Sequence, residues 1–351
     1  MTEFTASLCQ FLNESHSPYH AQAALRRTLN AEGYVNLPEG GEWNLIPGGK
    51  YYVCRGGAAV IAFRIPTEPP KGFLMAAAHT DRPSLKLKEN GEKVGAYTSL
   101  QVERYGGLLI APWLDRPLSL AGRVMVQTEQ GAKSVLVDID RDLLLIPNVA
   151  IHMNRQANDG YKWNPVMDVN PLLGGKNAAG KLTTLLEEAA GGKILGHDLT
   201  LYVRENARVW GMDNEYISSQ ALDDLQCVWG CFRGFLNAAP SGDIPVFCAL
   251  NSEEIGSRTT DGADSTYVED VLTRIAEGLH RNVRKMLSQS FLVSADNAHA
   301  IHPNHPELAD PSNAPVMGDG IVVKFNSNQR YCTDGLCAAL FRQVCEKAGA
   351  S

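Results

Sequence analysis

The sequence predicts an α/β protein in which a mixed sheet flanked by helices is interrupted by an inserted, mostly β block. Apolar runs bounded by turn residues alternate with helical patterns before residue 89 and again after residue 210. Between those points the chain has short β-like runs and segments rich in Gly, Asn and Pro. With 351 residues, the chain is long enough for a large core and two domains.

Composition excludes several classes of function. A hydrophobic content of 44% and a charged content of 20% are ordinary for a soluble globular protein, and a net charge of -7 argues against nucleic-acid binding. No apolar run reaches the roughly 20 residues of a membrane helix. The first residues lack the basic and apolar regions of a signal peptide. The eight cysteines form no Cys-x-x-Cys pair, so we expect free thiols and a cytoplasmic protein.

The N-terminal part begins with two predicted helices, at 3–14 and 18–32. Ser17 and Pro18 suit an N-cap followed by proline at the first helical position. Three β-like runs follow, at 51–54, 58–65 and 72–78. The last of them ends in His79-Thr80-Asp81.

The short β-like runs of the middle block predict short strands, and Glu129-Gln130-Gly131 is predicted to form a turn. One helical pattern occurs near 181–190. A strand at 199–203 leads out of the block. The β-like runs before that helix lie at 102–110, 122–127, 134–139 and 143–154.

The last third returns to alternating helices and strands, which argues for helices on both faces of a sheet. The predicted helices lie at 222–236, 268–288 and 335–348. The predicted strands lie at 244–250, 291–294 and 320–325.

Three predicted strands end in side chains that could bind a metal. His79 and Asp81 follow the strand at 72–78, Glu253 and Glu254 follow 244–250, and Asp296 follows 291–294. In open α/β sheets ligands bind beyond the carboxyl ends of the strands. Acidic side chains gathered there would repel one another without a cation, and this donor set suits zinc, manganese or cobalt.

Each of these signals also has a structural interpretation. Asp223 and Asp224 open a predicted helix, so one can cap it while the other binds metal, and a carboxylate can bridge two ions. Asp81 can accept the second ring N–H of a metal-bound His79, or it can be a capping residue beside a core histidine. The Glu253-Glu254 pair can be a solvated turn, or one Glu can bind a metal while the other acts as general base.

Taken together, these stretches resemble the aspartyl aminopeptidase family. The resemblance covers nearly the whole chain, and the stretches occur in the family's order. They are Ala77-Ala78-His79-Thr80-Asp81-Arg82-Pro83, Ile146-Pro147-Asn148-Val149-Ala150-Ile151-His152-Met153-Asn154-Arg155, Ala221-Leu222-Asp223-Asp224-Leu225, Asn251-Ser252-Glu253-Glu254-Ile255-Gly256-Ser257, Ser294-Ala295-Asp296-Asn297-Ala298-His299-Ala300-Ile301-His302-Pro303-Asn304 and Lys324-Phe325-Asn326-Ser327-Asn328-Gln329-Arg330-Tyr331.

The resemblance implies a two-zinc exopeptidase that releases N-terminal residues, preferably Asp or Glu. It implies that His79 and Asp296 hold one metal, that Asp223 bridges the two metals, and that Glu254 holds the other metal. Glu253 becomes the general base.

The resemblance also implies roles around the metals. Asp81, His299 and His302 are expected to orient the ligands or the substrate. Lys324 is expected to meet the acidic side chain of the substrate, with a plain surface lysine as the alternative. His152 matches a residue that reaches a neighbouring subunit's active site.

The resemblance divides the chain into a zinc-peptidase-like catalytic domain, 1–88 and 211–351, and an inserted dimerisation domain, 89–210. Family members assemble into closed homo-oligomers.

The chain departs from the family at its C-terminal end. The family's remaining metal ligand is a histidine in a later segment, and no histidine follows His305. We therefore expect a fragment or a shortened relative, in which the second metal would have only Asp223 and Glu254. Two alternatives to the aminopeptidase follow: a non-catalytic relative that forms oligomers or binds peptides, and an amidase or deacylase that uses the same two-metal chemistry.

Overall fold

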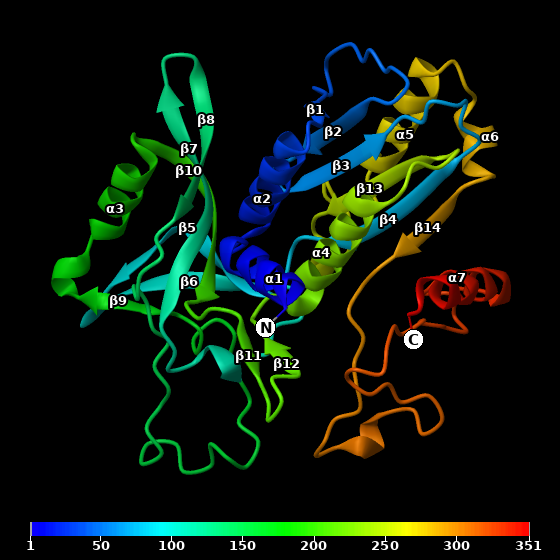
Figure 1. Cartoon of the computed structure of the whole chain (residues 1–351). Helices are drawn as coiled ribbons and strands as arrows, with labels where there is room; N and C mark the ends of the chain where they lie inside the picture. The colour runs from blue at the N-terminus through cyan, green and yellow to red at the C-terminus, as the bar shows by residue number, and fades with distance from the viewer. Residues whose placement is uncertain (1, 351) are drawn as a thin grey trace. The chain divides into compact units, whose positions relative to one another are not determined.

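The computed structural model describes residues 2–350, which form two compact units that divide after Asp296. The first unit contains all three β-sheets (Figure 1). The second unit, 297–350, contains the 3-10 helix η4 (Pro306–Leu308) and the helix α7 (Gly335–Ala348). Among the described residues, no helix combines the length and the apolar content that a membrane span requires.

Sheet A is the mixed sheet that the sequence predicts. Its central strand β13 runs parallel to β4 and antiparallel to β3, and β14 pairs in parallel with the other side of β4. In spatial order its strands are β1 (Val35–Asn36), β2 (Lys50–Arg55), β3 (Ala59–Arg64), β13 (Ile244–Leu250), β4 (Phe73–His79) and β14 (Phe291–Ser294).

Helices cover both faces of sheet A. Because successive side chains along a strand point to opposite faces of the sheet, each strand contributes to two cores. On β13, Phe247 and Ala249 join the core formed with α1 (Glu3–Glu14), α2 (Pro18–Ala31) and α4 (Leu222–Asn237). Val246 and Cys248 point to the opposite core, which contains residues of α5 (Tyr267–Gly278) and α6 (Val283–Leu287). The predicted α/β class is confirmed.

Sheet B is antiparallel and has its own core, to which α3 (Lys181–Ala190) contributes Leu182 and Leu186. The 3-10 helices η1 (Ala111–Trp113) and η2 (Lys176–Ala178) lie in its connections. In spatial order its strands are β8 (Gly131–Asp138), β7 (Leu118–Thr128), β10 (Ile194–Val203), β5 (Ser84–Val94), β6 (Tyr97–Tyr105) and β9 (Leu172–Gly175). A separate hairpin pairs β11 (Arg208–Trp210) with β12 (Tyr216–Ser218).

The structure corrects several predicted elements. The predicted helix at 268–288 is two helices, because α5 ends at Gly278 and Asn282 caps the start of α6. The predicted strand at 320–325 is irregular chain, with Ile321 56% exposed, so its apolar side chains lack the packing that a strand needs.

In the middle block, 143–154 forms only isolated bridges, at Leu144, Leu145 and Ile146. The strand predicted at 102–110 ends at Tyr105, where two glycines follow. β5 begins at Ser84, ahead of the predicted inserted segment, and the division at 89–210 stays a prediction.

Candidate metal centre

Three chain segments meet at the carboxyl ends of the strands of sheet A. His79 is the last residue of β4, Asp223 and Asp224 open α4, and Asp296 follows β14. The pairing of Leu250 with His79 aligns the ends of β13 and β4. Because parallel strands present their carboxyl ends at one edge, residues from distant parts of the sequence converge there.

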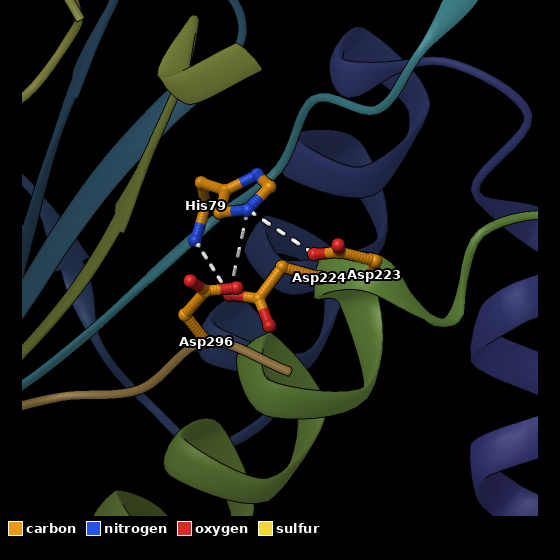
Figure 2. A group of neighbouring side chains, drawn as sticks. All are labelled: His79, Asp223, Asp224 and Asp296. Carbon is orange, nitrogen blue, oxygen red and sulfur yellow. Dashed lines mark hydrogen bonds and ion pairs between the residues drawn. The ribbon is translucent and has the colours of Figure 1, made fainter. Parts of the chain in front are cut away.

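His79, Asp223, Asp224 and Asp296 form one cluster, in which one ligand atom from each residue lies within 4.8 Å of the others (Figure 2). His79 Nε2 lies 3.4 Å from Asp223 Oδ1 and 4.0 Å from Asp224 Oδ2. His79 and Asp224 are buried, whereas Asp223 and Asp296 are exposed. One side of the cluster is therefore buried, and the other side is open to solvent.

The electrostatics of the cluster favour a bound cation. Burial alone would lower the pKa of His79, but hydrogen bonds with Asp223 and Asp81 and the charge of Asp224 raise it to about 11. Burial and the charge of Asp296 raise the pKa of Asp224 to about 7, against the influence of His79 and Cys227. Positive charge is thus stabilised at the centre of the carboxylates.

The donor set fits zinc. One imidazole and three carboxylates are common zinc ligands, and one ligand atom from each lies within 4.8 Å of the others. Asp224 Oδ2 accepts a hydrogen bond from the backbone N–H of His79 at 3.1 Å. Its other oxygen, Oδ1, is buried and has no hydrogen-bond partner among the described residues. A buried carboxylate oxygen left without a partner is costly, and a cation would satisfy it.

The two adjacent glutamates lie on η3 (Glu253–Ile255), immediately after β13. Glu253 is 54% exposed, and its Oε2 lies 3.9 Å from His79 Nε2. Glu254 is half-buried and is not in the four-residue cluster. Burial and the charge of Asp223 raise the pKa of Glu254 to about 7, which indicates that Glu254 adjoins the exposed side of the cluster.

Asp81 is fully buried and joins β4 to η3. Its Oδ1 accepts from the backbone N–H of Glu253 at 3.0 Å, and its Oδ2 accepts from that of Glu254 at 3.2 Å. His79 Nδ1 lies 3.0 Å from the backbone carbonyl oxygen of Asp81 and 3.3 Å from Oδ1. The expected histidine–aspartate contact is therefore shared between the backbone carbonyl and the carboxylate.

The remaining predicted residues lie elsewhere in the chain. His152 is exposed in a turn of the connection between β8 and β9. His299, His302 and Lys324 belong to the second unit, whereas all four cluster residues belong to the first. Lys324 Nζ donates to the backbone carbonyl of Asn297 at 2.7 Å.

Asp224 is the cluster residue that the sequence prediction leaves unassigned. Its only signal in the sequence is its position beside Asp223. α4 has no side-chain hydrogen bond at its N-cap, Ala221, and the Asp223–Asp224 peptide bond is cis. Both side chains belong to the cluster, so the expected split between one capping and one binding aspartate does not describe this site.

The fold and the cluster together define a candidate metal-dependent hydrolase. Comparison with known proteins gives its family: the profile described as "Aminopeptidase I zinc metalloprotease (M18)" matches residues 11–351. A "Probable M18 family aminopeptidase 2" from Clostridium acetobutylicum is 37% identical over 363 residues, which cover 99% of this chain and 84% of that protein.

Two solved structures agree with this result. The structure titled "Cryo-EM structure of the Ape4 and Nbr1 complex" has a TM-score of 0.94 and 34% identity, covering 99% of this chain and 73% of that chain. The S. cerevisiae mApe1 dodecamer shares the fold, with a TM-score of 0.88 and 23% identity over 99% of this chain and 84% of that one.

The chain belongs to the M18 family of zinc metalloprotease aminopeptidases. The predicted family and class of enzyme are confirmed.

Proposed function

We propose that this aminopeptidase releases N-terminal Asp or Glu from peptides by a metal-dependent attack of water on the first peptide bond. The observation that carries the proposal is the cluster at the end of sheet A, where Glu253 Oε2 lies 3.9 Å from His79 Nε2. A carboxylate beside a metal-binding imidazole suits a general base in hydrolysis.

We assign His79 and Asp296 to one metal ion, Asp223 to a bridging position and Glu254 to a second ion. We add Asp224 to these ligands, because it belongs to the cluster and its buried Oδ1 has no hydrogen-bond partner among the described residues. Zinc is the metal that the family description supports, and two ions per chain is our proposal. When bound, zinc would polarise the scissile carbonyl and lower the pKa of water.

Glu253 is exposed and can reach the water that attacks the peptide bond. It takes one proton from that water while the oxygen bonds to the carbonyl carbon. As the C–N bond breaks, the same carboxyl group returns the proton to the leaving nitrogen. One water is consumed, and the products are an amino acid and a shortened peptide.

We assign selectivity for acidic residues to Lys324, whose ammonium group would pair with the substrate side chain. Lys324 Nζ donates to the Asn297 carbonyl, in the segment that directly follows Asp296. His299 and His302 lie in the same segment, and we assign them to orienting Asp296 or the substrate.

We also propose that the chain forms homo-oligomers through the 89–210 segment, with His152 reaching a neighbouring subunit. The connection between β8 and β9 exposes Met153 (83%), Val166 (66%) and Met167 (72%), and apolar exposure of this kind marks association surfaces. The mApe1 relative is a dodecamer. Light scattering on the purified chain measures the assembly. The eight free cysteines support a reducing, cytoplasmic location.

The test is an aminopeptidase assay on the purified chain. We expect release of N-terminal Asp and Glu from short peptides, little release of Leu or Lys, loss of activity after chelation and recovery with zinc. Metal analysis should give two zinc ions per chain. Equal release of Leu would contradict the substrate assignment. Activity that survives complete metal removal would contradict the mechanism.

A further inference from the structure

Sheet B contributes a side chain to the loop that carries the two glutamates. The Tyr105 hydroxyl, at the end of β6, donates to Asp81 Oδ2 at 2.8 Å. Asp81 in turn accepts the backbone N–H groups of Glu253 and Glu254. Asp81 Oδ2 accepts from both the Tyr105 hydroxyl and the Glu254 backbone N–H, so one carboxylate joins the end of β6 to η3.

The residue after Tyr105 shows how closely β6 approaches η3. Gly106 has a φ of +73°, and a Cβ placed on it would lie 2.9 Å from Glu254 Cβ and 3.1 Å from Glu254 Oε2. Only glycine permits this approach without displacing the Glu254 side chain. The end of β6 is therefore packed directly against the residues that follow β13.

From these contacts we propose that Tyr105 is a positioning residue for the reaction, which acts through Asp81 to hold Glu253 and Glu254 in place. The inference rests on the proposed function for its kinetic consequence, but the contacts themselves do not depend on it. Asp81 is fully buried, so its carboxylate needs several donors, and the Tyr105 hydroxyl is one of them, beside two backbone N–H groups and the His79 ring. Without that donor, Asp81 would be held less firmly and η3 would open more often.

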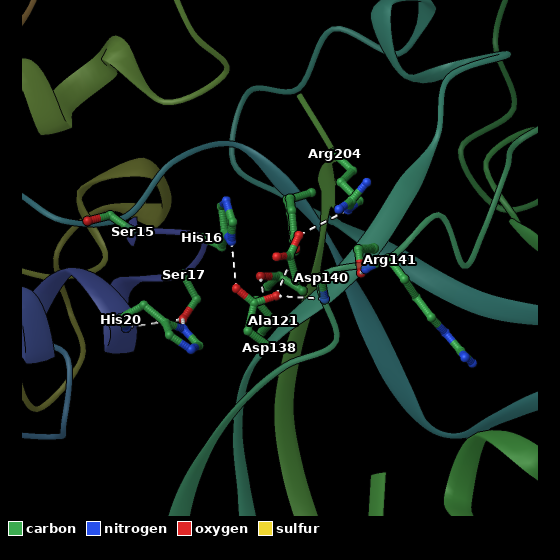
Figure 3. A network of polar contacts seen from close by, with 12 residues as sticks. Ser15, His16, Ser17, His20, Ala121, Asp138, Asp140, Arg141 and Arg204 are labelled. Atoms are coloured by element: carbon green, nitrogen blue, oxygen red, sulfur yellow. Dashed lines mark hydrogen bonds and ion pairs between the residues drawn. The ribbon is translucent and has the colours of Figure 1, made fainter. Parts of the chain in front are cut away.

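Tyr202 offers a matched control. It also lies on sheet B, and its hydroxyl donates to Asp138 Oδ1 at 2.7 Å. Asp138 belongs to a separate polar network, in which His16 Nδ1 lies 2.6 Å from Asp138 Oδ2 (Figure 3). Tyr202→Phe thus removes the same kind of tyrosine–aspartate hydrogen bond without touching η3.

The experiment compares Tyr105→Phe and Tyr202→Phe in the full chain by hydrogen exchange and by kinetics. We expect the amides of 251–257 to exchange about tenfold faster in Tyr105→Phe, with no change in that segment in Tyr202→Phe. We expect kcat of Tyr105→Phe to fall about tenfold with KM nearly unchanged. In an Asp81→Asn background, Tyr105→Phe should have little further effect, because the two residues act in series.

Unchanged exchange at 251–257 in Tyr105→Phe would overturn the inference, whatever the activity. Equal effects of the two tyrosine variants on that segment would overturn it as well. If the unaltered chain lacked metal-dependent peptidase activity, the proposed function would fail. The exchange comparison would then still decide whether Tyr105 holds the glutamate loop.

Discussion

The backbone N–H of His79 donates a hydrogen bond to Asp224 Oδ2 over 3.1 Å, joining the last residue of β4 to the start of α4. The two residues are 145 positions apart in the chain. The other oxygen of Asp224, Oδ1, is buried and has no hydrogen-bond partner among the described residues. The oxygen that stabilises the fold and the oxygen that can bind a cation thus belong to the same carboxylate.

Asp224→Asn should therefore weaken zinc binding while keeping the bond to the His79 backbone. An amide has the same shape and retains an acceptor oxygen, but it lacks the negative charge. We expect a loss of about 10- to 100-fold in zinc affinity, measured by competition with a chelator. Asp213→Asn, in an exposed turn, is the control. Affinity equal to that of the unaltered chain would show that Asp224 is not needed for metal binding.

Glu253→Gln should keep the zinc content and lose turnover. The amide cannot take a proton from water, and removing a general base typically costs about 10²- to 10⁴-fold in kcat. Metal analysis and steady-state kinetics on the same preparation test both statements. Glu277→Gln, on the exposed side of α5, should behave as the unaltered chain does. Full activity of Glu253→Gln would remove Glu253 from the mechanism.

Gly106→Ala should disturb the site, whereas Gly107→Ala should not. At Gly106 the new methyl group would collide with Glu254, and the positive φ adds strain of roughly 1–3 kcal/mol. At Gly107 no heavy atom lies within 4 Å of the added Cβ. We expect a lower melting temperature and a lower kcat for Gly106→Ala alone. If the two variants had the same melting temperature and the same kcat, the result would argue against the close packing of β6 on η3.

Asp198 should make protein stability depend on pH. Burial alone would raise its pKa, but hydrogen bonds from Arg123 and Lys86 hold the pKa below its ordinary value. Because the folded pKa is lowered, the stabilisation is present above the ordinary pKa and is lost as pH falls through the folded pKa.

Asp198→Asn should consequently cost about 0.5–1 kcal/mol at pH 7, a modest value because these side chains are partly exposed. The difference from the unaltered chain should shrink below about pH 3.9. Urea unfolding of metal-free protein at several pH values measures both quantities. A difference that stayed constant down to low pH would contradict the assigned ion pairs.

The apolar runs and helical patterns in the sequence predicted every strand of sheet A except β1, and they predicted the helices α1, α2 and α4, because each of these elements buries one continuous apolar face. These patterns gave wrong predictions in two situations. In one, an apolar run does not pack against another element, and in the other, a helix end interrupts a continuous helical pattern. The run at 320–325 reads as a strand, yet Ile321 and Val322 are exposed. The apolar pattern continues across Leu279, but Gly278 and Asn282 end one helix and start the next.

The sequence by itself determined the family, the metal-binding residue types at the strand ends, and the pairing of a candidate base with a candidate ligand at Glu253 and Glu254. Those features are local, since each depends on a strand followed by polar residues. Only the tertiary structure decided that Asp224 joins Asp223 in the cluster and that Tyr105 reaches Asp81 from another sheet. Such contacts depend on how distant segments pack, and no local periodicity encodes the distance between them.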